Sequence, residues 1–131
     1  MPTVDYELTP CEEEIMLYIW EKGEVKSREV LEYFNAVKGK DWKKQTLNTY
    51  FTHLIEKGVL KAEGETRKVY SPAVSKKKYD HKKARSVVKN SYGGHVSNFV
   101  AAFCGGEKIS PEEVEELQRM LDAKMAELKQ D

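Results

Sequence analysis

The sequence predicts a mostly α-helical fold with one small β-hairpin, and three observations lead to this prediction. Apolar residues recur at the spacing of one helix face in several segments, the clearest of which spans residues 42–58. A Thr-Pro or Ser-Pro pair followed by Glu marks a helix start at residues 9 and 110. Two short segments, 59–62 and 68–71, carry residues that favour strands and flank a turn that contains glycine.

The first two helices are expected within residues 9–35. Thr9 at the N-cap, Pro10 at the first helical position and Glu12 form a capping box. This first helix should end near Gly23, and its buried residues should be Ile15, Met16, Ile19 and Trp20. The second helix should start at Ser27, whose hydroxyl can cap it, and run through Val30, Leu31 and Phe34 to about Asn35.

The third helix should present one apolar and one polar face. The apolar face consists of Leu47, Phe51, Leu54 and Ile55. The opposite face carries Lys44, Gln45, Asn48, Thr49 and Thr52, and no carboxylate precedes Glu56. Such a face suits the edge of a base pair, although an ordinary solvated helix face has the same composition. Gly58 should end the helix in the left-handed conformation.

Three helices followed by a hairpin are the element order of a winged helix-turn-helix domain. We assign residues 1–74 to this domain, with a recognition helix at about 43–57 and a wing at 60–71. Residues 75–131 should form three more helices, whose apolar stripes are too thin to make a core alone. A second copy of this region would cover them in a two-fold dimer. The expected dimerisation residues are Tyr79, Val88, Tyr92, Val96, Phe99, Val100, Phe103, Val114, Leu117, Leu121 and Leu128.

Charge is distributed unevenly, although the formal net charge is zero. Residues 1–23 have a net charge of −5, residues 24–90 of +9, and residues 91–131 of −4. A basic middle region between acidic ends is expected where one region meets phosphate and another does something else. The helical tract after Ser75 is especially basic, and it could either attract phosphate or be a solvated face.

Several function classes are not expected. Cys11 and Cys104 stand far apart without a nearby His at ligand spacing, so we predict packing roles for both and no metal site. No grouping of nucleophile, base and acid indicates an enzyme, and no motif indicates a cofactor. The sequence shows no membrane-spanning run or signal peptide, which predicts a cytoplasmic protein.

Residues 7–125 resemble the penicillinase-repressor family in four segments that keep the family's order and nearly its spacing: LTPCEEEIMLYIWEKGEV, DWKKQTLNTYFTHLIEKGVL, VYSPAVSKKKYDHKKARSVVKNSYGG and FVAAFCGGEKISPEEVEELQRML. The more specific features are Trp20-Glu21, Trp42 with Thr46 and Thr49, and Tyr92-Gly93-Gly94. The resemblance implies a dimeric winged-helix repressor that blocks transcription of resistance or stress genes until a signal removes it.

The chain departs from the family pattern at two places that bear on induction. The antibiotic-responsive members are induced by proteolysis at an Asn-Phe bond, and the aligned position here is Ala102-Phe103, with Asn98-Phe99 four residues earlier. The copper-responsive branch ends in paired cysteine motifs, whereas Cys104 stands alone here. The resemblance therefore predicts no copper sensing, and it leaves the inducing signal and any upstream sensor or protease open.

A third departure lies at the start of the recognition helix. Lys43 stands where the family commonly has a small hydroxyl cap, so Asp41 or the backbone must cap the helix. Gln45 and Asn48 stand at positions that are often basic in relatives, and their amides can make bidentate contacts to adenine. An operator different from those of the resistance regulators is therefore expected.

The expected partner is double-stranded DNA with a pseudo-palindromic site, bound by a homodimer. Lys43 and Lys44 should meet phosphates or a guanine edge, Gln45, Asn48 and Thr49 should face bases, and Thr46 should contact the backbone. Ser27 and Arg28 can hold a phosphate at the second helix's N-terminus, and Arg67 and Lys68 complete the footprint at the wing. The rival interpretation is a winged-helix module that docks another protein.

Overall fold

The computed structural model describes residues 7–106 and 108–130. It forms two compact units, Met1–Ser86 and Val87–Asp131, which we call the winged-helix unit and the C-terminal unit. The boundary between them falls inside α4 (Lys76–Ser91). The sequence placed the functional division between residues 74 and 75, whereas the structure packs the first part of α4 with the winged-helix unit.

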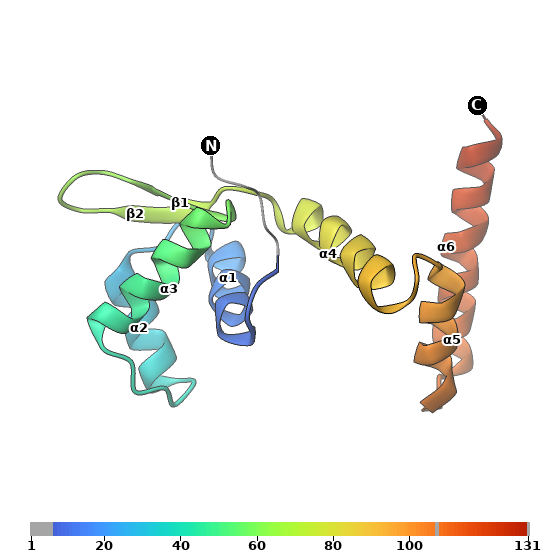
Figure 1. The fold of residues 1–131 in the computed structure, drawn as a ribbon, viewed down its shortest axis with the longest axis horizontal. Coiled ribbons are helices and arrows are strands. Elements are labelled where there is room, and N and C mark those ends of the chain that lie inside the picture. Colours follow the sequence, from blue (N-terminus) through green and yellow to red (C-terminus); the bar gives the residue numbers. More distant parts are fainter. Residues whose placement is uncertain (1–6, 107, 131) are drawn as a thin grey trace. The chain divides into compact units, whose positions relative to one another are not determined.

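Three helices and a two-stranded hairpin precede α4 in the chain (Figure 1), so the predicted fold class is confirmed. These elements are α1 (Pro10–Lys22), α2 (Ser27–Ala36), α3 (Lys44–Glu56), β1 (Leu60–Glu63) and β2 (Val69–Pro72). The strands are antiparallel, with Leu60 opposite Pro72 and Glu63 opposite Val69. Each strand begins and ends one residue later than the sequence predicted.

The two helix starts predicted from a Thr-Pro or Ser-Pro pair, at residues 9 and 110, are present. At α1, the Thr9 hydroxyl accepts a hydrogen bond from the Glu12 N–H at 3.3 Å, and Glu12 Oε1 accepts one from the Thr9 N–H at 2.8 Å. The predicted capping box is therefore confirmed. At α6 (Pro111–Lys129), Ser110 Oγ accepts from the Glu113 N–H at 3.2 Å.

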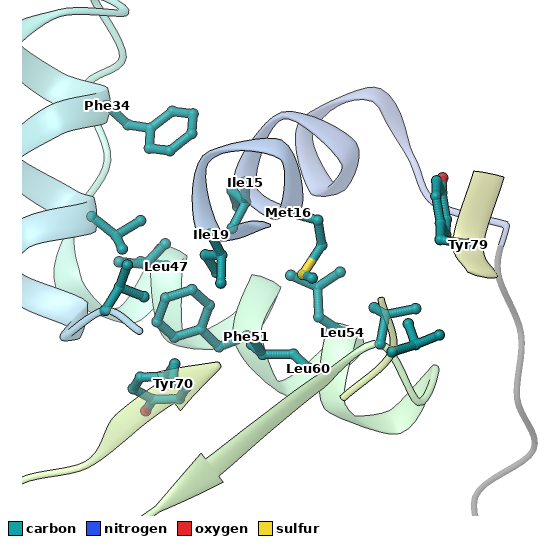
Figure 2. Close-up of a cluster of buried hydrophobic side chains, with 14 residues drawn as sticks. Ile15, Met16, Ile19, Phe34, Leu47, Phe51, Leu54, Leu60, Tyr70 and Tyr79 are labelled. Carbon is teal, nitrogen blue, oxygen red and sulfur yellow. The ribbon is translucent and has the colours of Figure 1, made fainter. Parts of the chain in front are cut away.

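The core of the winged-helix unit lies between α1, α2, α3 and the hairpin (Figure 2). Ile15, Phe34 and Leu54 are fully buried, and the Phe51 ring lies 4.3 Å from the Tyr70 ring between centroids. Tyr70 thus packs into the core from β2. Trp20 is half-buried, and its Nε1 donates to the Val74 carbonyl at 2.9 Å.

Two local predictions are corrected by the structure. Ile55 is 37% exposed instead of facing the core, because it lies beside the wing at the end of the apolar stripe. Ser27 is the first residue of α2 and not its cap, since Lys26 takes the N-cap position and its N–H is held by Glu29 Oε1 at 2.7 Å. Lys26 at the N-cap and Glu29 in the first turn thus take the place of the expected Ser27 hydroxyl cap.

The segment between α2 and α3 is fixed by one side chain. Asn35 Nδ2 donates to the Trp42 carbonyl, and Asn35 Oδ1 accepts from the Trp42 N–H, both at 2.9 Å. The Trp42 ring stacks on Phe34, with 5.1 Å between centroids. This pairing sets where α3 begins, because Trp42 lies two residues before its first turn.

The hairpin is attached to the connection between α1 and α2. Val25 and Tyr70 exchange two backbone hydrogen bonds, of 2.9 and 2.8 Å, as an isolated antiparallel bridge. No local pattern in the sequence indicates this pairing, because the two residues are 45 positions apart. The bridge adds a third backbone segment at the base of the wing.

The C-terminal unit contains the end of α4, α5 (Val96–Gly106) and α6. No side chain of α5 or α6 that the structure describes is buried. Its exposed apolar side chains include Val96, Phe99, Val100, Phe103, Val114, Leu117, Leu121 and Leu128. Within residues 7–106 and 108–130, no helix is long and apolar enough to span a membrane.

Candidate nucleic-acid interface

The start of α3 carries a continuous set of exposed polar side chains. Its N-cap is Lys43, which caps through its backbone without a side-chain hydrogen bond, so Asp41 does not serve as the cap. The helix is held in the core by Leu47, Phe51 and Leu54. The predicted contact residues Lys43, Lys44, Gln45, Thr46, Asn48 and Thr49 are all exposed.

Two shallow depressions flank Asn48. The first lies between α3 and the hairpin and is lined by Lys44, Asn48, Thr52, Thr66, Lys68 and Tyr70, with Ser27, Phe51, Ile55, Ala62 and Glu65 around them. The second runs along α3 and is lined by Gln45, Asn48, Thr49, Thr52, His53 and Glu56. Asn48 and Thr52 border both, whereas Thr46 borders neither. Asn48 therefore lies at the centre of the polar face.

The hydroxyls on this face are turned toward the helix backbone. Thr49 Oγ1 donates to the Gln45 carbonyl at 3.0 Å, and Thr52 Oγ1 donates to the Asn48 carbonyl at 2.9 Å. Their donor hydrogens are thus engaged, so these hydroxyls present acceptor lone pairs outward. The amides of Gln45 and Asn48 carry both donors and acceptors and are the groups able to read a base edge in two places.

Thr52, Thr66 and Ile55 line the depression beside the wing, although none of them is among the contact residues predicted from the sequence. Thr52 was visible in the sequence as part of the polar face, one turn after Asn48. Thr66 and Ile55 gave no signal, because their place in the groove depends on how the hairpin folds against α3. The groove is therefore a product of tertiary structure.

The N-terminus of α2 borders the same groove through Ser27. The N–H groups of Ser27 and Arg28 belong to the first turn, where no intrahelical acceptor is available, so they can hold an anion. The Arg28 side chain is 90% exposed and pairs with Glu32 at 3.2 Å. A surface pair of this kind is weak, so Arg28 can exchange it for a phosphate.

The wing carries Arg67 and Lys68, both exposed, after a turn at Gly64. Gly64 has φ of +99°, and a Cβ at this position would lie 2.8 Å from the Arg67 carbonyl oxygen. Only glycine fits here without a backbone shift, because both the left-handed conformation and the close approach disfavour a side chain.

Replacing Gly64 with Ala should therefore reshape the wing tip. If Arg67 and Lys68 contact phosphates as the sequence predicted, binding to duplex DNA should weaken by about threefold to tenfold. Fluorescence anisotropy with an operator duplex measures this effect. Gly39→Ala is the matched control, since Gly39 also has positive φ but no atom within 4 Å of the added Cβ. Equal losses for both variants would show that the wing turn has no special part.

The C-terminal end of α3 is fastened to α1. Glu12 is only 2% exposed, and its Oε1 accepts from Lys57 Nζ at 2.7 Å, while His53 Nδ1 lies 3.9 Å from Oε2. Burial alone would raise the pKa of Glu12, but hydrogen bonds from Lys57 and from the Thr9 N–H outweigh it and lower that pKa. Gly58 and Val59 close the helix behind Lys57 with N–H bonds to Ile55 and Leu54.

The start of α4 is fastened to α1 by the neighbouring carboxylate. Glu13 Oε2 accepts a hydrogen bond from Tyr79 Oη at 2.9 Å and pairs with Lys83 Nζ. The hydrogen bond from Lys83 lowers the pKa of Glu13. Burial raises this pKa, but the hydrogen bond from Tyr79 lowers it further, so the net shift is downward. Burial and the nearby Glu13 raise the pKa of the Tyr79 hydroxyl.

Tyr79 was predicted to be a dimerisation residue, but the structure buries it in the winged-helix unit. It is 2% exposed in the winged-helix core, with its ring 4.9 Å from Trp20 between centroids, so it has no surface to offer a second copy. Its position on the α4 stripe could not reveal this, because the stripe faces α1 at its start. Val88 and Tyr92 are half-buried, and the other eight expected dimerisation residues are exposed.

The cysteines have different surroundings. Cys11 is half-buried in α1, whereas Cys104 is exposed on α5, which corrects the expected packing role for Cys104. Among the described residues, no group of three or more His, Cys, Asp or Glu side chains is arranged to hold a metal ion.

Comparison with known proteins relates this chain to one family of proteins. The family model described as penicillinase repressor matches residues 8–123. The penicillinase repressor of Bacillus licheniformis is 29% identical over 117 residues, which cover 88% of this chain and 90% of that protein. The methicillin resistance regulatory protein MecI of Staphylococcus aureus (strain N315) is 29% identical over 126 residues, covering 95% and 100%.

A solved structure extends the likeness to the fold. The solution structure of the DNA binding domain of the repressor BlaI matches with a TM-score of 0.50 and 28% identity, over 58% of this chain and 90% of that one. That domain and the three helices and hairpin described above have the same kind of fold. Because the family model spans nearly the whole sequence, this chain belongs to the penicillinase repressor family.

Proposed function

We propose that this chain is a DNA-binding transcriptional repressor that acts as a homodimer on a pseudo-palindromic operator. In this proposal α3 enters the major groove and the wing lies on the flanking sugar-phosphate backbone. Family membership supports the general function, since the relatives are named as repressors or resistance regulators. They carry no enzyme names, and the protein-docking alternative has no observation in its favour.

The observation that carries the proposal is the polar face of α3 around Asn48. The face is exposed, is continuous with the groove beside the wing, and contains no acid on α3 before Glu56. An ordinary solvated helix face would not need to adjoin both a basic wing and a helix N-terminus. Here Lys68 and Ser27 border the same groove as Lys44 and Asn48.

We assign roles by chemistry and position. Gln45 and Asn48 present amides suited to adenine, and Thr49 presents an acceptor to the same edge. Lys43 and Lys44 meet phosphate or a guanine edge, while Thr46, to one side, contacts the backbone. Ser27 and Arg28 hold a phosphate at α2, and Arg67 and Lys68 hold others at the wing.

Exposed apolar side chains in the C-terminal unit support the homodimer. Phe103 is 59% exposed and Leu121 is 70% exposed, and neither has a covering element within the described residues of this unit. Contiguous exposed apolar surface of this kind marks an interaction site. In a homodimer the same apolar surfaces of two copies would cover each other, and the dimer would carry two recognition helices, as a palindromic site requires.

Binding to duplexes that tile the protein's own upstream region tests the proposal. One pseudo-palindromic tile should bind tightly, with affinity that falls steeply as salt rises. Asn48→Ala should weaken binding to this tile by about tenfold and leave a scrambled duplex unaffected, since an amide contact carries about 1–3 kcal/mol of discrimination. Fluorescence anisotropy at several salt concentrations measures both.

The control for that experiment is Lys38→Ala, at an exposed position in the segment between α2 and α3. It should reduce binding to both duplexes alike or not at all. Equal, weak and salt-independent binding of every duplex by the natural protein would contradict the repressor proposal and turn attention to a protein partner.

A separate prediction addresses the dimer. Leu121→Glu should raise the dimer dissociation constant by about a hundredfold, because an unpaired carboxylate would be buried against the second copy. Ala123→Glu, on the opposite side of α6, should leave the constant nearly unchanged. Sedimentation-equilibrium ultracentrifugation measures both, and equal behaviour of the two variants would exclude this stripe as the interface.

A further inference from the structure

The first part of α4 is far more basic than any function assigned so far requires. The helix carries seven Lys or Arg residues and a single acid, Asp80. Lys76 pairs with Asp80 at 2.8 Å, and Lys83 pairs with Glu13 of α1. The only acid on the helix is therefore already engaged by Lys76.

Three other cations form a single line along the helix. Lys78, Lys82 and Arg85 are exposed and recur at i, i+4 and i+7, so they lie on one face. We call these three residues the basic ridge. The exposed positions beside it hold Lys77, His81 and the small Ala84, so no large apolar side chain is exposed there.

This arrangement opposes helix stability. Like charges three or four positions apart on a helix repel each other, and the ridge contains both spacings. Lys78 also sits in the first turn, where the helix dipole disfavours a positive charge. A helix of this composition gains most from an anionic partner that neutralises several cations together.

The ridge is held firmly on the winged-helix unit. Tyr79, between Lys78 and Asp80, is buried against Trp20, and its hydroxyl donates a hydrogen bond to Glu13. Ser75 Oγ accepts from the Lys78 N–H at 3.1 Å and fixes the first turn. The ridge residues all precede the boundary of this unit at Ser86, so they move with α3 and the wing.

We infer that the basic ridge is a second phosphate-binding surface, which contacts the backbone of duplex DNA outside the segment read by α3 and the wing. Duplex DNA fits better than a membrane or a peptide groove, because the apolar neighbours of the ridge, the small Ala84 and the half-buried Val88, offer no large exposed apolar side chain to enter either. This inference rests on the proposed function. It adds an electrostatic contact to phosphate that strengthens binding without distinguishing between DNA sequences.

The test compares the double variant Lys78→Gln/Arg85→Gln with Lys124→Gln/Lys129→Gln in the full-length chain. Both remove two positive charges, and the second pair lies on α6. Anisotropy titrations use the operator duplex and a scrambled duplex of equal length, each at several salt concentrations. Asn48→Ala is measured beside them.

The ridge variant should bind both duplexes about tenfold more weakly at low salt. The slope of log affinity against log salt should fall by about 3.6, since the dimer loses two phosphate contacts from each protomer and each contact contributes roughly 0.9. Asn48→Ala should lose affinity for the operator alone, and the α6 variant should match the natural protein. Thermal unfolding checks folding, and the ridge variant should not be less stable because glutamine removes repulsion while keeping helix propensity.

Unchanged affinity and slope for the ridge variant, with tight operator binding by the natural protein, would overturn the ridge and leave the repressor proposal intact. A loss equal to that of the α6 variant would also overturn it, because net charge alone would then explain the effect. No binding of either duplex by the natural protein would overturn both proposals.

Discussion

Replacing Phe51 with Ala should lower the free energy of unfolding of the winged-helix unit by about 3–5 kcal/mol. Phe51 is 2% exposed and joins α3 to the hairpin through Tyr70, whose ring lies 4.3 Å away between centroids. The variant loses the transfer energy of the ring and leaves a cavity under the recognition helix. A unit of this size has total stability of the same order, so much of the variant should be unfolded.

Urea denaturation followed by tryptophan fluorescence measures this loss, since both tryptophans of the chain, Trp20 and Trp42, pack against this core. Leu17→Ala is the control, because Leu17 lies on α1 with 44% exposure and should cost less than about 1 kcal/mol. The two variants must be compared at equal protein concentration, because the proposed dimerisation would add to their apparent stability. A loss at Phe51 no larger than at Leu17 would contradict the assigned core.

Removing the charge of Glu12 should have the second-largest effect, a loss of about 2–4 kcal/mol at neutral pH. Glu12→Gln keeps an oxygen for the Thr9 N–H, because glutamine also serves in a capping box. The change therefore isolates the interaction with Lys57, whose ammonium would remain without its carboxylate at the end of α3.

The same residue predicts how stability depends on pH. The pKa of Glu12 is lowered by folding, so its contribution is complete above the ordinary pKa of 4.5 and is lost as pH falls through the folded value. Glu13 acts in the same direction through Lys83 and Tyr79. Glu12→Gln should therefore flatten the loss of stability between about pH 5 and pH 3.

Urea midpoints measured across this pH range, with Glu24→Gln as the control at an exposed position, test the prediction. The natural protein and the control should lose stability in parallel as the pH falls. Should Glu12→Gln follow the same curve, another carboxylate would be responsible for the acid sensitivity.

Local patterns in the sequence predicted most of the helices, because caps and periodicity act over a few residues. Thr9 and Ser110 marked helix starts, and Leu47, Phe51 and Leu54 marked the buried face of α3. Family resemblance then indicated which helix should meet DNA. These parts of the fold depend on neighbours in the chain, so they were accessible before the structure.

The features that escaped prediction join distant segments. Glu12 was recognised as a capping residue, but its partner Lys57 lies 45 positions away. Tyr79 was assigned to a dimer interface, because its stripe does not reveal that α1 already covers it. Ile55 continues the helical period of α3, yet the hairpin and not the core lies next to it. In each case the deciding neighbour comes from another element.

The bridge between Val25 and Tyr70 gives the wing a fixed base and a free end. Two backbone hydrogen bonds hold β2 there, whereas Arg67 and Lys68 stand beyond it in the turn. Bending should therefore concentrate between Glu63 and Val69, so that in the proposed DNA-bound arrangement the cationic tip can adjust to the flanking sugar-phosphate backbone without shifting α3. In amide hydrogen exchange, the N–H groups of Val25 and Tyr70 should accordingly exchange far more slowly than those of the turn.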